Sequence, residues 1–125
     1  MRGYEDLFVW RRGMDLAEEV YRLCRVGDLK RDWGLRNQLT RSAVSVPSNI
    51  AEGYERGGRK EFARALTIAK GSCGEVRTQL VIAQRAGLIS GADVAKGVAM
   101  STEVSALLAK LRAVVRRQKD DPERS

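Results

Sequence analysis

The side chains best suited to chemistry in this chain are its cations. Lys and Arg number 23 against 16 Asp and Glu, which gives a net charge of +7. A basic surface of this kind attracts polyanions such as nucleic acid or acidic membranes. The basic residues gather in two segments, and we expect the following to contact phosphate groups: Arg59, Lys60, Arg64, Lys70, Arg77, Lys110, Arg112, Arg116, Arg117 and Lys119.

A second interpretation of the same residues stays open. Cations near a helix C-terminus are favoured by the helix dipole, and charge on an exposed helix face often serves solvation alone. The basic residues are not interleaved with aromatic ones, and no recognition-helix pattern is present. If nucleic acid binds, the sequence therefore predicts contact with its backbone and no readout of its bases.

Catalytic and metal chemistry is poorly supplied. The chain has no histidine, which removes Ser-His-Asp and Cys-His nucleophiles, most zinc sites and the Glu-x-x-His pairs of di-iron bundles. Gly57-Gly58 lacks the following Lys-Ser/Thr of a phosphate-binding loop. Cys24 and Cys73 lie on apolar stripes, so we interpret them as buried thiols in a reducing compartment. We expect no enzymatic activity, no metal and no cofactor.

A polar stripe runs beside the apolar one in the segment 33–56. Its members recur at spacings of four, three and four, with one asparagine beside them: Arg41, Ser45, Ser48, Asn49 and Glu52. The stripe could contact a ligand or nucleic acid. Alternatively, it forms an internal network in which Arg41 and Glu52 pair with each other or with neighbouring helices. The sequence favours the internal network.

Small and apolar residues also recur where a single bundle would carry charge. They predict a surface for association with further copies of the chain. The residues expected at this interface are Val44, Ala51, Ile68, Gly71, Thr78 and Ile82.

All of these side chains require helices to position them. Apolar residues at spacings of three and four predict helices over about 5–26, 33–56, 59–86 and 91–119, followed by a polar tail at 120–125. The third helix has the most regular seam, and we expect its members to be buried: Phe62, Leu66, Ala69, Cys73, Val76, Leu80 and Ala83. The predicted fold is therefore a single all-α domain over 1–125, an antiparallel up-down four-helix bundle.

Three local features refine this expectation. Pro47 lies inside the second helix and predicts a kink or a break there, because proline lacks an amide hydrogen. Asp32 and Ser90 resemble N-caps of the second and fourth helices. The other predicted core stripes are Leu7, Trp10, Met14, Ala17, Tyr21 and Cys24 in the first helix, Leu35, Leu39, Ala43, Val46 and Ile50 in the second, and Met100, Val104, Leu107, Leu111 and Val114 in the fourth.

The chain contains no apolar signal region and no stretch long enough to span a membrane. We therefore expect a cytoplasmic protein without membrane contact.

Four runs of residues resemble a known family. They are Tyr4-Glu5-Asp6-Leu7-x-Val9-Trp10, the segment from Leu35 to Gly53 with its Pro47-Ser48-Asn49-Ile50-Ala51-Glu52-Gly53 run, Lys60-Glu61-Phe62, and Ala69-x-Gly71-Ser72-x-x-Glu75. Over about residues 4–90 the chain resembles the bacterial four helix bundle protein family. Members of this family include proteins encoded in 23S ribosomal RNA intervening sequences. The family is related to the accessory variability determinant proteins of diversity-generating retroelements.

The resemblance implies the four-helix fold, a homopentameric barrel of bundles and no enzymatic activity. For the retroelement relatives it also implies binding to nucleic acid and to a reverse transcriptase. Together with the charge, it favours a non-enzymatic oligomeric bundle that binds RNA or DNA through backbone phosphates. The alternative is a protein-interaction scaffold with no direct role in nucleic-acid binding.

Overall fold

Four long helices make up the chain in a computed structural model, which describes residues 3–118. They are α1 (Phe8–Leu23), α2 (Trp33–Arg56), α3 (Arg59–Arg85) and α4 (Gly91–Arg117), with short 3-10 helices η1 (Tyr4–Asp6) and η2 (Gly27–Arg31). Within the described residues there is no strand. The predicted tail at 120–125 lies outside them.

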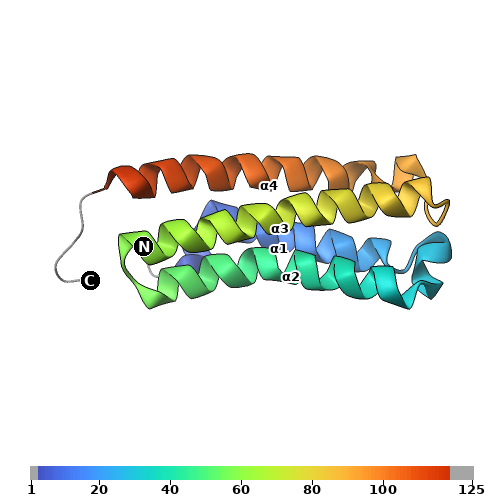
Figure 1. The fold of residues 1–125 in the computed structure, drawn as a ribbon, viewed down its shortest axis with the longest axis horizontal. Coiled ribbons are helices and arrows are strands. Elements are labelled where there is room, and N and C mark those ends of the chain that lie inside the picture. The colour runs from blue at the N-terminus through green and yellow to red at the C-terminus, as the bar shows by residue number, and fades with distance from the viewer. Residues whose placement is uncertain (1–2, 119–125) are drawn as a thin grey trace.

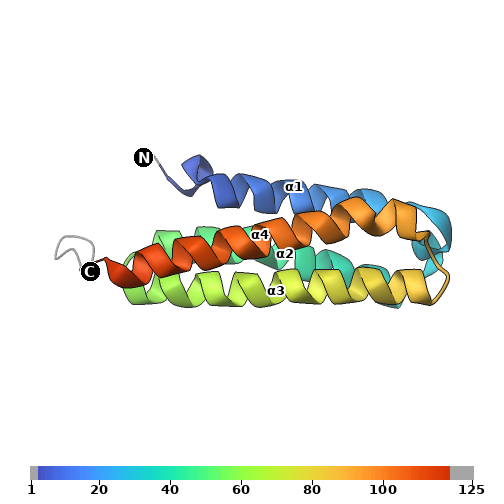
Figure 2. The same ribbon diagram turned by 90° about the horizontal axis from the view of Figure 1, so that it is seen from above.

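The helices follow an up-down path in which each lies antiparallel to the next (Figures 1 and 2). Helix α2 packs against α3, α3 against α4, and α1 contacts both α2 and α4. At one end, the backbone amides of Asp28 and Leu29 donate to the carbonyl of Leu88 at 2.9 and 3.1 Å. These bonds join the α1–α2 connection to the α3–α4 connection. The predicted all-α antiparallel bundle is confirmed.

Helix ends follow the local chemistry of the sequence. The Asp32 carboxylate accepts a hydrogen bond from the Leu35 amide at 3.0 Å, and the Ser90 hydroxyl accepts one from the Asp93 amide at 3.1 Å. Both predicted N-caps are therefore confirmed. Between α2 and α3 the chain turns through Gly57 and Gly58, whose φ angles of 72° and 83° favour glycine.

The core lies where the apolar seams of the middle helices predict it. All seven residues of the predicted α3 seam are buried, and in α2 the stripe from Leu39 to Ile50 is buried as well. The α2 and α3 backbones approach closely at Gly53, since a Cβ there would lie 2.3 Å from the Cβ of Ala65. The small residues at this point set how closely the two helices pack.

The first helix differs from the prediction in length and in its buried face. The 3-10 helix η1 replaces the start of the predicted helix at 5–26, and a turn at 24–26 replaces its end, so α1 covers only Phe8–Leu23. Its core side chains are Val9, Leu16, Val20 and Leu23, together with Ala17 and Cys24 of the predicted stripe. Met14 and Tyr21 are 37% and 50% exposed. The helix has two apolar stripes, and the one with the larger side chains was predicted to be buried.

The fourth helix also departs from its predicted stripe near its end. Met100 and Val104 are buried as expected, whereas Val114 is 44% exposed, and Leu108 and Val115 are buried instead. Ser101 and Ser105 are buried too, so the buried face of α4 is rotated from the predicted stripe toward the positions one residue further along.

The sequence predicted a kink or a break at Pro47. Helix α2 continues through this residue, so the predicted break is wrong. Side chains add hydrogen bonds around the proline. The Asn49 amide donates to the Ser45 carbonyl at 2.7 Å, and the Ser45 hydroxyl donates to the Ser42 carbonyl at 3.0 Å. Pro47 itself is buried against α1, where Gly13 leaves room for it.

Candidate nucleic-acid interface

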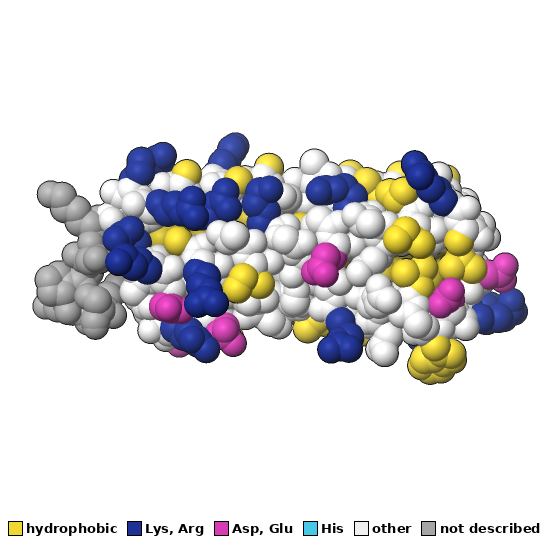
Figure 3. Space-filling view, in the orientation of Figure 1, with side chains coloured by type: hydrophobic (Ala, Val, Ile, Leu, Met, Phe, Trp, Pro, Cys, Tyr) yellow, Lys and Arg dark blue, Asp and Glu magenta, His cyan; other side chains and the backbone are white. Residues whose placement is uncertain are grey.

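Five of the predicted phosphate-binding cations follow the line where α3 and α4 pack together. We call this set the cationic strip, and its members are Arg59, Lys70, Arg77, Arg112 and Arg116. Lys70 and Arg77 are seven residues apart in α3, and Arg112 and Arg116 are four apart in α4, so each pair shares one helix face. In the space-filling view, Lys and Arg side chains form a row over α4 and α3, densest near the end of α4 (Figure 3).

Arginines of the cationic strip reach across from one helix to the other. The Arg77 guanidinium donates to the Thr102 hydroxyl at 3.2 Å. In the opposite direction, the Arg112 guanidinium donates to the Thr67 hydroxyl at 3.3 Å. These bonds occupy one of the five N–H donors of each guanidinium and hold its position without neutralising its charge.

The α1–α4 side of the bundle shows a different use of arginine. Arg12 donates to both carboxylate oxygens of Glu103, at 2.6 and 3.2 Å, and to Asp15 at 2.6 Å. Among residues 3–118, by contrast, Lys70, Arg77 and Arg112 form no ion pair with a carboxylate. The positive charges of these three residues are therefore available to an external anion.

The remaining predicted cations lie elsewhere. Arg64 lines a groove between α2 and α3 together with Glu52 and Glu61, which lie 3.7 and 3.9 Å from Arg56 in the same groove. Lys110 lies between α1 and α4 among apolar side chains. Lys60 and Arg117 are exposed near the start of α3 and the end of α4. Lys119 lies outside the described residues.

The cysteines lie where thiols are unreactive. Burial raises the pKa of Cys73 to about 11, although the nearby charges of Arg77 and Lys70 act in the opposite direction. Burial also raises the pKa of Cys24. Both cysteines are buried and free, as interpreted from the sequence. No group of three or more His, Cys, Asp or Glu within residues 3–118 could hold a metal ion.

The polar stripe of α2 divides into two parts. All five of its residues line a shallow groove of about 440 Å³ that also includes Tyr21 and Thr40. Ser45 and Asn49 are half-buried, and the Ser45 hydroxyl is hydrogen-bonded to the Ser72 hydroxyl on α3. Arg41, Ser48 and Glu52 are exposed. Among residues 3–118, Arg41 and Glu52 form an ion pair neither with each other nor with a neighbouring helix; Glu52 lies 3.7 Å from Arg56 of the same helix.

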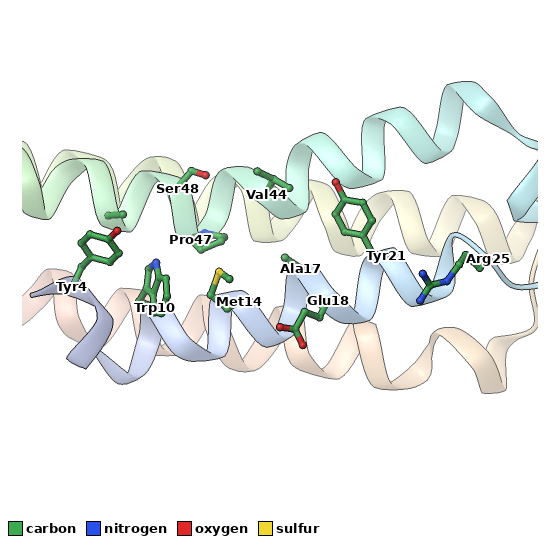
Figure 4. A pocket seen from close by; sticks show the side chains of 11 residues that line it. Tyr4, Trp10, Met14, Ala17, Glu18, Tyr21, Arg25, Val44, Pro47 and Ser48 are labelled. Atoms are coloured by element: carbon green, nitrogen blue, oxygen red, sulfur yellow. The ribbon is translucent and has the colours of Figure 1, made fainter.

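A larger and more apolar groove lies between α1 and α2. It has a volume of about 600 Å³, and we call it the apolar groove. Trp10, Met14 and Tyr21 project from α1 toward Val44 and Pro47 of α2 (Figure 4). The sequence did not predict this groove, because the same α1 side chains were expected in the core. The available signal was a second apolar stripe in that helix.

The predicted interface residues lie on two separate surfaces. Val44, which is 41% exposed, and Ala51 line the apolar groove. Ile68 and Ile82 are 47% and 49% exposed on α3, where Gly71 and Thr78 are also exposed. The structure thus brings two of the six residues to one side of the bundle and the other four to α3.

Fold and surface together define a class, the basic all-α four-helix bundles. The family model of the 23S rRNA-intervening sequence protein matches residues 5–110, and the chain belongs to that family. This confirms the family resemblance seen in the sequence.

A solved structure shares the fold. It is a protein of unknown function from the S23 ribosomal protein family of Bacteroides thetaiotaomicron, with a TM-score of 0.76 and 22% sequence identity. The similarity covers 83% of this chain and 97% of that one. Neither description mentions an enzymatic activity. No curated protein matches the chain. No helix of residues 3–118 has the length and apolar character needed to cross a membrane.

Proposed function

We propose that this protein is a non-enzymatic cytoplasmic bundle that associates with copies of itself and binds RNA or DNA through backbone phosphates. The cationic strip carries the proposal. Arg77 and Arg112 donate hydrogen bonds to hydroxyl groups of the opposite helix, so these two guanidinium groups are positioned but not neutralised. Ordered guanidinium groups of this kind suit phosphate oxygens, which they bind with short, charge-assisted hydrogen bonds.

The composition of the cationic strip favours binding without sequence preference. Helix α4 contains no aromatic residue, and the single aromatic residue of α3, Phe62, is buried. Unstacked bases therefore find no ring to stack on, which leaves charge as the main attraction. If all five cations contact phosphates, log K should fall with log salt with a slope of about −4.5 on duplex DNA and about −3.5 on single strands.

The resemblance to known families extends the proposal to assembly and partners. It supports a homopentamer, and the relationship to diversity-generating retroelements supports a reverse transcriptase as a protein partner. A gene position beside a reverse transcriptase would favour that partner, whereas a position inside a ribosomal RNA gene would favour ribosomal RNA as the ligand.

Binding over a salt series tests the proposal. We expect a double variant, Arg77→Gln with Arg112→Gln, to bind RNA and DNA more weakly, with a salt slope reduced by about 1.8 on duplex DNA and about 1.4 on single strands. A single Arg31→Gln variant controls for the loss of positive charge. Arg31 does not belong to the cationic strip, and its guanidinium is paired with the Asp28 carboxylate at 3.0 Å. Negligible binding by the unmodified protein at low salt would contradict the proposal.

The apolar groove favours the second candidate function, a protein-interaction scaffold. An open groove with exposed Met14, Tyr21 and Val44 is typical of a surface that another protein covers. Under this alternative, nucleic-acid affinity is weak at physiological salt and unaffected by the strip variants, while one specific protein accompanies the chain at fixed stoichiometry.

A further inference from the structure

Two apolar surfaces of the bundle remain uncovered, and their shapes differ. One is the concave apolar groove between α1 and α2. The other is the outward face of α3, where residues recur at spacings of three and four. We call it the α3 ridge, and its members are Ile68, Gly71, Glu75, Thr78 and Ile82, all of them exposed. A convex row of side chains and a concave groove on the same chain allow one copy to fit another.

Gly71 has no explanation within the chain. A Cβ at this position would meet nothing within 4 Å. Glycine inside a helix costs about 1 kcal/mol relative to alanine, so an unneeded one weakens α3. At Gly53, by contrast, the close approach of α2 and α3 excludes any side chain. A second chain packed closely on the α3 ridge would give Gly71 the same kind of role.

The charges on the two surfaces are complementary. Glu75 lies in the middle of the α3 ridge, and Arg41 lies in the groove that adjoins Tyr21 and Val44. Both are exposed, and neither has an ion-pair partner within residues 3–118. The α3 ridge therefore carries one carboxylate without an ion-pair partner. The apolar groove and its rim carry Arg25, Arg41 and Glu18, so their net charge is positive.

The heights of these charges along the bundle also agree. The Ser45 hydroxyl contacts the Ser72 hydroxyl, so these residues lie level on the antiparallel helices α2 and α3. Because the helices are antiparallel, the residue four before Ser45 is level with the residue four after Ser72. Arg41 therefore lies level with Val76, next to Glu75. Copies placed side by side without an axial shift would therefore have the Glu75 of one at the height of the Arg41 of the other. Closed rings require such an arrangement.

We propose that a second copy of this chain packs its α3 ridge into the apolar groove, with Glu75 facing Arg41 across the contact. The two surfaces are different, so the interface is heterologous and repeats from copy to copy until the ring closes. This inference rests on the self-association proposed above and identifies the two surfaces that form it. The cationic strip lies on the α4 side of α3, outside the contact.

Light scattering of matched aspartate variants tests the contact. Val44 and Val114 are exposed to similar extents, 41% and 44%, on different sides of the bundle. We expect the unmodified protein to have a mass that is a multiple of 13.9 kDa. Val44→Asp should reduce it to that of one chain, as should Ile68→Asp, whereas Val114→Asp should leave it unchanged. Circular dichroism checks that all variants stay helical.

Two results would overturn the inference in different ways. If Val44→Asp and Ile68→Asp assemble normally, the proposed surfaces are wrong, although self-association stands. If the unmodified protein is a single chain at every concentration tested, both the contact and the self-association proposed above are wrong. Phosphate binding is judged separately by the salt series.

Charge reversal distinguishes a contact between copies from one within a copy. Arg41→Glu and Glu75→Arg should each weaken assembly, because like charges then meet at every contact. Mixing the two variants should restore assembled species that neither forms alone, since each mixed contact pairs opposite charges. A mixture that assembles no better than its components would contradict the Arg41–Glu75 contact.

Discussion

The α3–α4 face and the α1–α2 face are each built from two neighbouring antiparallel helices, yet their surfaces are opposite in character. Beside the core seam of α3 and α4 lie arginines, a lysine and hydroxyl groups, which give a charged surface (Figure 3). Beside the seam of α1 and α2 lie Trp10, Met14 and Val44, which give an apolar groove (Figure 4). The residues that flank a seam therefore determine what each face can bind.

The α1–α4 side shows that the charge a face presents also depends on the partners of its arginines. Arg12 has two carboxylate partners there, so its charge is compensated inside the molecule. Arg77 and Arg112 differ from Arg12 because they contact only hydroxyl groups among the described residues. A count of basic residues cannot separate these cases. The type of partner that each guanidinium contacts can.

The largest effect should come from reversing charge on the α3–α4 face alone. We expect Arg77→Glu with Arg112→Glu to lower nucleic-acid affinity on the order of 100-fold at moderate salt, because two phosphate contacts become repulsive. Assembly should be unchanged, because the substituted residues lie outside the α3 ridge. Filter binding measures the nucleic-acid affinity, and light scattering of the same sample measures the assembly. Loss of assembly together with binding would show that the two faces do not act independently.

Packing between α2 and α3 should hold the two faces in their relative positions. Gly53→Ala places a Cβ 2.3 Å from that of Ala65, so the helices must separate. We expect a loss of about 1–3 kcal/mol in the free energy of unfolding. Gly34→Ala in the same helix is the control, since its Cβ would meet only the Asp32 carboxylate, at 3.8 Å. Denaturant titration compares the free energies of unfolding of the two variants. Equal values would contradict the close approach of α2 and α3 at Gly53.

Much of the fold follows from sequence, and the reasons are local. The seam of α3 predicts its buried face because its apolar residues recur without interruption at spacings of three and four. Caps at Asp32 and Ser90 predict helix starts because they need only the adjacent amides. In α1 the same reasoning failed. Two apolar stripes compete there, and only the packing of α2 and α4 decides that Val20 is buried and Tyr21 exposed.

The candidate site was predictable only as a list of basic residues. Spacing shows which cations share a helix face, but it does not show which face meets a neighbouring helix. The structure places Arg77 and Arg112 along the same α3–α4 contact, at different heights, and places Arg64 and Lys110 elsewhere. That sorting depends on how each helix is rotated in the bundle, which the partner helices determine.

A buried carboxylate outside both faces should affect stability without affecting either proposed surface. Glu19 is 6% exposed, and its hydrogen bonds to Arg22, at 2.7 and 2.9 Å, lower its pKa. A lowered pKa stabilises the fold at neutral pH, and this contribution is lost as the pH falls through the carboxylate range. We therefore expect Glu19→Gln to be less stable than the unmodified protein at pH 7, with the difference narrowing in acid. Thermal unfolding at several pH values measures this, and a difference independent of pH would contradict it.

The smallest expected effect separates the roles of two glycines in α3. Gly71 lies on the α3 ridge, while Gly74 lies toward α4, and neither meets a close neighbour within the chain. Alanine at either position should stabilise the single chain by up to about 1 kcal/mol, because helical glycine is unfavourable. Only Gly71→Ala should also weaken assembly, since its methyl group would separate the α3 ridge from the groove of the next copy. Unfolding of dilute protein and light scattering at higher concentration distinguish the two effects. If Gly71→Ala gains stability and assembles as tightly as Gly74→Ala, then no second backbone packs against Gly71, and the α1–α2 groove is covered by something other than the α3 ridge.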